Sequence, residues 1–121
     1  MRILVVDDDP MVQILLQQFL SAEGHQVHIV SNGCEALDAL QHTPYDLALT
    51  DVHMPYMSGD LLVEFIHKNG ISVPIVVMES YPDAFFEKTS TDQVCAVLAK
   101  PFDLDAIRQI LHRIGTVPVW R

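Results

Sequence analysis

The sequence predicts an α/β fold: a single domain with a five-stranded parallel sheet and five helices on both faces of the sheet. Two observations support this prediction. Five short apolar runs alternate with helix-type patterns along the 121 residues, and such alternation is typical of parallel sheets joined by right-handed crossovers. The runs are continuous, which indicates strands that are buried on both faces. A chain of this length is expected to form one domain.

The composition excludes several classes of protein. The formal net charge is −9, and the seven Lys and Arg residues are scattered, so the domain itself is not expected to bind nucleic acid. No apolar run reaches the length of a membrane span. The acids that begin at Asp7 leave too short an apolar stretch for a signal peptide. Cys34 and Cys95 lie far apart without metal-binding spacing and are expected to be reduced thiols, which favours a cytoplasmic location.

The first expected strand is Ile3–Val6, and the first helix follows it closely. Asp9 is an acid at the N-cap position, and Pro10 stands at the first helical position, where its missing N–H costs nothing. Gly24 is the expected stop of this helix. The inward side chains that the helical spacing predicts are Val12, Leu15, Leu16, Phe19 and Leu20.

The remaining strands and helices alternate to the end of the chain. The second helix is expected between Asn32, which resembles a capping box with Glu35, and the break at Thr43-Pro44. The third follows Gly59 and ends near residues 69–70. The other expected strands are Val27–Val30, Asp46–Thr50, Ile75–Met78 and Val94–Leu98.

The fourth helix is the least clear, because the stretch 79–92 has little apolar periodicity; a short helix is expected at residues 84–88. Asp103 is expected to cap the last helix. The inward side chains expected in the second, third and last helices are Ala36, Leu37, Leu40, Leu61, Leu62, Phe65, Ile66, Leu104, Ile107, Leu111 and Ile114.

Chemically active side chains follow four of the five expected strands. In an open parallel sheet, ligands bind beyond the carboxyl ends of the strands. The residues at these ends, which are therefore expected to meet at one edge, are Asp7 and Asp8 after the first strand, Asp51 after the third, Glu79 and Ser80 after the fourth, and Lys100 after the fifth.

Three motifs at these strand ends resemble one known family, the receiver domain of two-component response regulators. They are Ile3-Leu4-Val5-Val6-Asp7-Asp8-Asp9-Pro10, then Asp51-Val52-His53-Met54-Pro55 with Gly59, and Lys100-Pro101-Phe102. Their order and spacing make the signal specific, and it covers essentially the whole chain, 1–121. The resemblance implies a flavodoxin-like three-layer fold with strand order 2-1-3-4-5.

The expected chemistry is phosphoryl transfer to Asp51. A carboxylate can attack a phosphoryl group and form an acyl phosphate, and Mg²⁺ prefers oxygen ligands of the kind gathered here. The resemblance implies that Asp8, Asp51 and the backbone carbonyl of His53 bind Mg²⁺ and that Asp7 acts mainly through a bound water. It also implies that Lys100 contacts a phosphate oxygen and that the Lys100-Pro101 peptide is cis.

The resemblance also implies partners and a signalling role. A histidine kinase or a histidine phosphotransfer protein would donate the phosphoryl group, and the domain would be a phosphoacceptor with self-catalysed transfer rather than a turnover enzyme. The region before the last helix and that helix itself would form the output and dimerisation face, so a homodimer is one expected state. The output would be received by a downstream protein.

Two positions depart from the pattern of the family and concern its switch. Receivers usually carry Thr or Ser where Glu79 stands, and an ionised carboxylate cannot donate a hydrogen bond to a phosphoryl group. Ser80 is next to it and would substitute only if the strand end were shifted. The usual aromatic residue three places before Lys100 is here Val97. The expected acceptor therefore has an atypical switch.

Two alternatives remain open at this stage. One is a phosphate-independent interaction module with the receiver fold, in which Glu79 forms a standing ion pair with Lys100. The other is a phosphatase of the haloacid dehalogenase type, suggested by Asp7-Asp8-Asp9 after a strand; this family needs a longer chain with a cap. Metal binding at the acid cluster separates the acceptor from the first alternative, and turnover of a phosphomonoester would support the second.

Overall fold

The computed structural model describes residues 1–54, 57–79, 94–100 and 103–115. Within them the chain forms one five-stranded parallel sheet in the order β2-β1-β3-β4-β5. The strands are β1 (Arg2–Val6), β2 (Gln26–Val30), β3 (Leu47–Asp51), β4 (Ile75–Glu79) and β5 (Val94–Ala99). The predicted fold class and strand order are confirmed.

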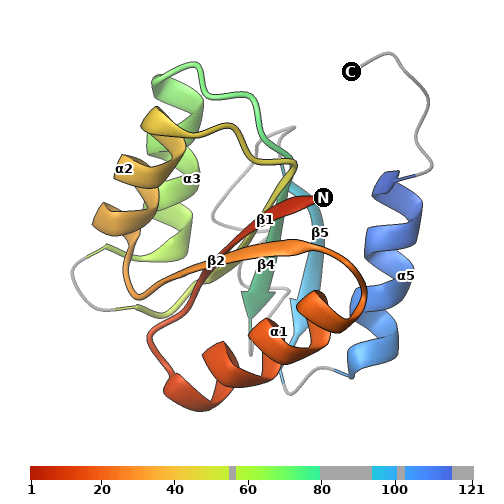
Figure 1. The fold of residues 1–121 in the computed structure, drawn as a ribbon. Helices are drawn as coiled ribbons and strands as arrows, with labels where there is room; N and C mark the ends of the chain where they lie inside the picture. The colour runs from red at the N-terminus through yellow and green to blue at the C-terminus, as the bar shows by residue number, and fades with distance from the viewer. Residues whose placement is uncertain (55–56, 80–93, 101–102, 116–121) are drawn as a thin grey trace.

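Helices cover both faces of this sheet, as predicted (Figure 1). The described helices are α1 (Pro10–Ala22), α2 (Gly33–His42), α3 (Gly59–Lys68) and α5 (Leu104–Gly115). α2 and α3 lie on one face, and α1 and α5 lie on the other. The described residues therefore contain four helices rather than the five predicted, and the helix predicted at 84–88 lies outside them.

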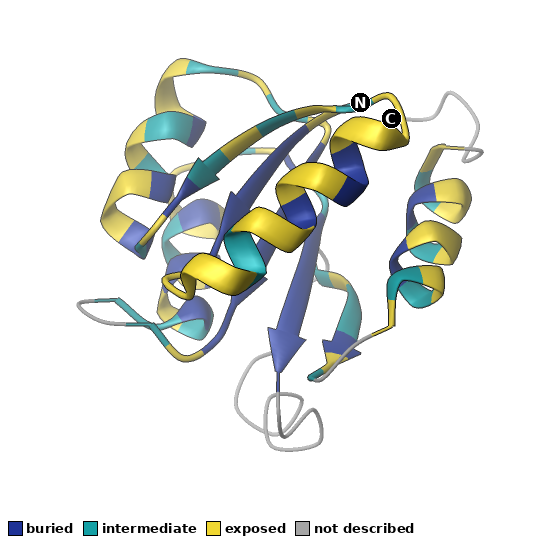
Figure 2. Ribbon diagram, turned by 60° about the horizontal axis from the view of Figure 1, so that its bottom comes forward, coloured by how far each residue is buried: buried dark blue, intermediate teal, exposed yellow. Residues whose placement is uncertain are grey.

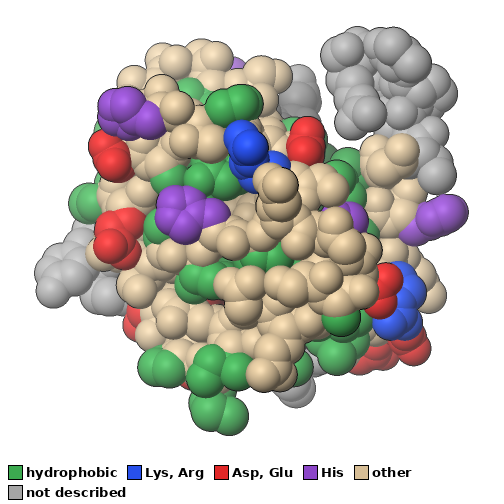
Figure 3. Space-filling model, in the orientation of Figure 1, with side chains coloured by type: hydrophobic (Ala, Val, Ile, Leu, Met, Phe, Trp, Pro, Cys, Tyr) green, Lys and Arg blue, Asp and Glu red, His purple; other side chains and the backbone are tan. Residues whose placement is uncertain are grey.

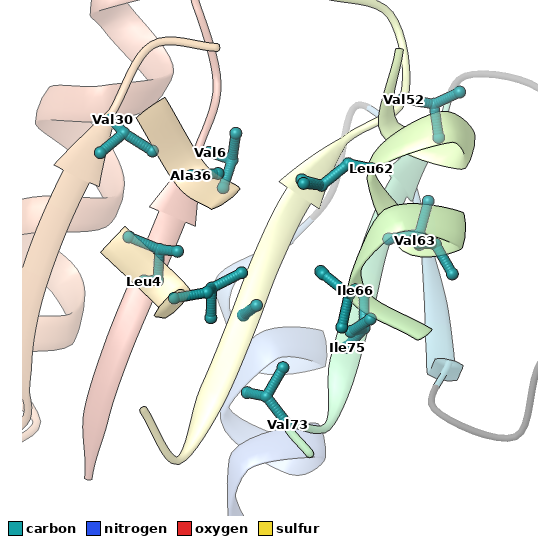
Figure 4. Close-up of a cluster of buried hydrophobic side chains, with 13 residues drawn as sticks. Leu4, Val6, Val30, Ala36, Val52, Leu62, Val63, Ile66, Val73 and Ile75 are labelled. Atoms are coloured by element: carbon teal, nitrogen blue, oxygen red, sulfur yellow. The ribbon is translucent and has the colours of Figure 1, made fainter. Parts of the chain in front are cut away.

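Each face of the sheet has its own hydrophobic core. Under α2 and α3, Leu4, Val6 and Ile75 from the strands meet Leu62 and Ile66 from α3 (Figure 4). Under α1 and α5, the opposite side chains of the same strands meet the two helices. Because successive strand residues point to opposite faces, β1, β3 and β4 are buried on both sides and appear as dark ribbons inside the molecule (Figure 2).

The strands β3 and β4 each extend one residue further at their carboxyl ends than the sequence predicted, and the added residue is in each case a site residue. Asp51 ends β3 and Glu79 ends β4, each as part of the strand. The backbone ladder continues past both: Val52 N–H donates to the carbonyl of Met78, and Lys100 N–H donates to the carbonyl of Glu79. A strand end is defined by this ladder, whereas the apolar run in the sequence stops where the first charged side chain begins.

The caps of three helices lie where they were predicted. The Asp9 side chain accepts from Met11 N–H at 2.9 Å, the Asn32 side chain accepts from Glu35 N–H at 2.9 Å, and Asp103 accepts from Asp105 N–H at 2.6 Å. Such caps satisfy backbone donors that have no partner inside the helix. Asp9 therefore belongs to α1, as predicted.

Two inward positions were predicted wrongly. Leu15 on α1 is 42% exposed and Leu61 on α3 is 39% exposed, whereas Val63, which was not predicted, is buried. A helical apolar stripe is only about 100° wide, and periodicity does not tell which edge of a wider apolar arc faces the sheet. Leu15 instead joins Met11 and Ile14 as an exposed apolar side chain of α1. This helix lies at the lower edge in Figure 1, and Figure 3, in the same orientation, shows hydrophobic side chains at the surface along that edge.

No helix among the described residues is long and apolar enough to cross a membrane.

Candidate functional site

Three carboxylates from two strand ends gather at the carboxyl edge of the sheet. Asp7 and Asp8 follow β1, and Asp51 ends the neighbouring β3. One carboxylate oxygen can be chosen from each residue so that the three oxygens all lie within 4.8 Å of one another. Asp7 and Asp51 are buried, with 0% and 6% of their surface exposed, while Asp8 is exposed. The cluster therefore has two buried acids and one that faces solvent.

Lys100 brings a positive charge to this cluster from the end of β5. Its Nζ lies 3.0 Å from Asp7 Oδ2 and 3.2 Å from Asp51 Oδ1. Burial alone would lower the pKa of Lys100, but the hydrogen bond and charge of Asp7, helped by Asp51, outweigh it, so the pKa lies above its ordinary value. Lys100 is thus held as a fixed cation against two acids.

The surroundings of Asp51 disfavour the ionised form of its carboxyl group. Burial, followed by repulsion from Asp7, raises the pKa of Asp51 above its ordinary value. Lys100 and a hydrogen bond from the backbone of His53 act in the opposite direction without cancelling the rise. The folded protein therefore holds an excess of negative charge around Asp51, and additional positive charge there would be favourable.

Backbone and side-chain hydrogen bonds hold Asp7 in place. Asp9 N–H donates to Asp7 Oδ1 at 2.9 Å, and Asp7 N–H donates to the carbonyl of Val30. Gln13, one turn into α1, donates to the carbonyl of Asp7 at 2.6 Å and to Ser31 Oγ at 3.2 Å. Sequence reasoning missed Gln13, since an amide on a helix flank carries no pattern of its own.

The turn after Asp51 is built around Gly59. A Cβ at Gly59 would collide with the carbonyl oxygen of Asp51 and would lie 2.8 Å from the Cα of Val52. Gly59 N–H also donates to the carbonyl of Val52 at 2.7 Å. The start of α3 therefore packs directly on the backbone of Asp51, which only glycine allows.

The carboxylate of Glu79 is paired with His53. Glu79 Oε1 lies 2.8 Å from His53 Nε2, and 4% of the Glu79 side chain is exposed against 66% of that of His53. In the described part of the chain, Lys100 forms its ion pairs with Asp7 and Asp51 rather than with Glu79. The contact between the His53 imidazole and Glu79 was not predicted. The sequence had assigned a role only to the backbone carbonyl of His53.

The other residues predicted for the switch lie partly beyond what the structure describes. Val97 is half-buried on β5, opposite Val77, and packs against the core under α2 and α3. Ser80 and Pro101 lie outside the described residues. The prediction that the Ser80 hydroxyl could replace the usual Thr or Ser, and the prediction of a cis Lys100-Pro101 peptide, therefore concern residues that the structure does not describe.

The donor set of the cluster suits a small divalent cation. Asp7, Asp8 and Asp51 offer hard carboxylate oxygens, the ligands that Mg²⁺ prefers, and a Mg²⁺ site commonly uses one or two carboxylates together with waters. Asp8 leaves the cluster open to solvent, so that waters have access. The raised pKa of Asp51 is a further sign that the site favours an added cation.

Comparison with known proteins gives one family. The family model described as the response regulator receiver domain matches residues 3–112. The sporulation initiation phosphotransferase F of Bacillus subtilis is 30% identical over 113 residues, which are 93% of this chain and 91% of that protein. The sensor histidine kinase TmoS of Ectopseudomonas mendocina is 36% identical over 110 residues, 88% of this chain but only 11% of the kinase.

Solved structures agree with this result. The receiver domain of a Pseudomonas aeruginosa sensor histidine kinase, with magnesium coordinated in its active site cleft, has a TM-score of 0.83 and 29% identity and covers 95% of this chain and 98% of that one. The response regulator TrrA of Thermotoga maritima, in complex with Mg²⁺ and BeF, has a TM-score of 0.83 and 30% identity, covering 93% of this chain and 97% of that one.

Proposed function

Because the chain belongs to the response regulator receiver domain family, we propose that it is a phosphoacceptor in which Asp51 takes a phosphoryl group from a phosphohistidine. The donor is a sensor histidine kinase or a histidine phosphotransfer protein. The observation that carries the proposal is the position of Asp51: a buried carboxylate grouped with the acids Asp7 and Asp8 and in contact with the ammonium of Lys100.

The transfer can be written from these groups. An oxygen of the Asp51 carboxylate attacks phosphorus, a P–O bond forms, the P–N bond to the donor imidazole breaks, and the released imidazole takes up a proton. Lys100 already reaches Asp51 at 3.2 Å and can turn from it to an oxygen of the phosphoryl group. The domain accepts and later loses one phosphoryl group, so it is a signalling acceptor and not a turnover enzyme.

The acid cluster is proposed to hold Mg²⁺. Asp8 and Asp51 would be direct ligands, Asp7 would act mainly through a water, and the backbone carbonyl of His53 would complete the set from the protein. The bound cation would neutralise charge on the transferred oxygens. Asp7 keeps a second task, since it holds Lys100 in place.

The switch that follows phosphorylation is proposed to be atypical. Glu79 cannot donate a hydrogen bond to a phosphoryl group, and its carboxylate is engaged by His53. Val97 supplies no aromatic ring that could change position. The output face, a downstream protein and a homodimer would then depend on other contacts than the hydroxyl and aromatic pair of most receivers.

The proposal is tested with acetyl phosphate and Mg²⁺, followed by intact mass. We expect one added phosphoryl group in the wild type and in the control Asp38→Asn, an exposed acid on α2. We expect none in Asp51→Asn. An unmodified wild type, or equal yields in the wild type and Asp51→Asn, would contradict the proposed function.

A further inference from the structure

The end of β4 carries a buried acid that the phosphoacceptor chemistry does not use. Glu79 is 3% exposed, and it lies between two strands whose ends carry reacting groups. On one side, Asp51 is in register with Met78, the residue before Glu79. On the other side, Glu79 is in register with Ala99, the residue before Lys100. A carboxylate therefore stands at the end of the strand that lies between the strand of the acceptor and the strand of its lysine.

This placement creates an electrostatic problem for a phosphoryl group on Asp51. The edge already holds the carboxylates of Asp7, Asp8 and Asp51, and phosphorylation adds further negative charge. Like charges at short range repel strongly where water is excluded. A carboxylate of Glu79 turned toward Lys100 would both repel the phosphoryl group and compete with it for the ammonium.

The structure shows where the carboxylate goes instead. Its Oε1 meets the Nε2 of His53 at 2.8 Å, and it is not part of the group of acids that lie within 4.8 Å of one another. The imidazole comes from the loop after β3, and 66% of the His53 side chain is exposed. The ammonium of Lys100 stays with Asp7 and Asp51.

From this contact we infer that His53 is a positioning residue, whose imidazole holds the Glu79 carboxylate away from the phosphoryl position on Asp51. The inference rests on the proposed function of Asp51. It assigns the His53 side chain a role separate from that of its backbone carbonyl. The two roles can be separated, since a substitution of the side chain leaves the carbonyl in place.

The first test examines the contact itself and needs neither metal nor phosphate. Nitrogen–proton correlation NMR of the histidine rings reports the hydrogen bonding of each ring nitrogen. We expect Glu79→Gln to shift the His53 ring signals and to leave those of His42 unchanged. His42 is a matched control, because it pairs with Asp38 on the surface of α2. Unshifted His53 signals would overturn the inference.

The second test measures the initial rate of phosphorylation by acetyl phosphate and Mg²⁺. We expect His53→Ala to slow it about fivefold, because the Glu79 carboxylate loses its contact with the imidazole and repels the incoming phosphoryl group. We expect His42→Ala to have no effect. In a Glu79→Gln background, His53→Ala should slow the reaction less than twofold, because no charge is left to position. His53→Gln, which keeps an N–H donor, should recover part of the wild-type rate.

The outcomes separate the inference from its premise. A loss of rate in His53→Ala that persists undiminished in the Glu79→Gln background would overturn the inference, since the imidazole would then act without Glu79. An equal rate in His53→Ala and the wild type would overturn it as well. A wild type that takes no phosphate contradicts the proposed function, and this is visible from intact mass before any variant is compared.

Discussion

The ammonium of Lys100 lies 3.0 Å from Asp7 Oδ2 and so joins the end of the last strand to the end of the first. Asp7 is fully buried, and 21% of the Lys100 side chain is exposed. Removing one partner costs about 3–5 kcal/mol in a buried pair and under about 1 kcal/mol in an exposed one. For Lys100→Met we expect a loss of about 2 kcal/mol in the free energy of unfolding, measured in urea without Mg²⁺.

The pH dependence of this loss follows from Lys100. Burial lowers its pKa, but Asp7 and Asp51 raise it above the ordinary value. The lysine then contributes stability that is fully present below its unfolded pKa and is lost as the pH rises through the folded pKa. The cost of Lys100→Met should stay constant from about pH 7 to about pH 9. Lys68→Met, on the exposed end of α3, serves as a control; an equal loss there would contradict the prediction.

Asp51→Asn should stabilise the metal-free protein at neutral pH. Burial and Asp7 raise the pKa of Asp51 in the folded state. Such a group favours folding below its unfolded pKa, and this contribution is lost as the pH rises through the folded pKa. The ionised Asp51 is therefore a cost at neutral pH, which the amide removes.

The gain from Asp51→Asn should shrink as the pH falls toward the acid range in which Asp51 becomes protonated. Urea unfolding of both proteins across this range measures it. A variant that is less stable than the wild type at neutral pH would show that the ion pair with Lys100 outweighs burial.

Sequence reasoning found the acid cluster because its argument needs only strand ends. Parallel strands end at one edge, so Asp7, Asp51 and Lys100 could be brought together without knowing any loop. The contact between His53 and Glu79 could not be found in this way. The contact depends on the course of the loop after β3, and a loop has no periodicity from which its course could be predicted. It also depends on Glu79 being the last residue of β4, whereas the apolar pattern ends the strand at Met78.

Gly59→Ala should disturb Asp51 without changing any charge. The new methyl group would collide with the carbonyl oxygen of Asp51 and with the Cα of Val52 at 2.8 Å. Neither atom is the free end of a side chain, so the backbone must shift. Overpacking of this kind costs about 1–3 kcal/mol, and we expect a loss in this range together with slower phosphorylation of Asp51.

A second glycine provides the control for this substitution. Gly115, at the end of α5, has nothing within 4 Å of a built Cβ, so Gly115→Ala should change the free energy of unfolding by no more than about 0.5 kcal/mol. If the two alanine variants unfold at the same urea concentration, the packing of Gly59 on Asp51 carries no energy.

Asp8 and Asp9 are neighbours with different expected roles, and one pair of substitutions separates them. Asp9 caps α1 through Met11 N–H, and the loss of such a cap costs about 1 kcal/mol. Asp8 is an exposed member of the acid cluster. We expect Asp9→Ala to lower the free energy of unfolding but to keep the stabilisation that Mg²⁺ provides. Asp9→Ser, which can still cap the helix, should recover most of the loss.

Asp8→Ala should show the opposite behaviour. A ligand at ten times its dissociation constant stabilises the folded state by about 1.4 kcal/mol, so Mg²⁺ should raise the melting temperature of the wild type and of Asp9→Ala. The same concentration should have little effect on Asp8→Ala, because a proposed ligand is gone while the cap remains. Thermal melts with and without Mg²⁺ measure both effects. If Asp9→Ala lost the response to Mg²⁺ and Asp8→Ala kept it, Asp9 rather than Asp8 would be the metal ligand. The backbone N–H of Asp9 that holds Asp7 survives both substitutions and could not explain that result.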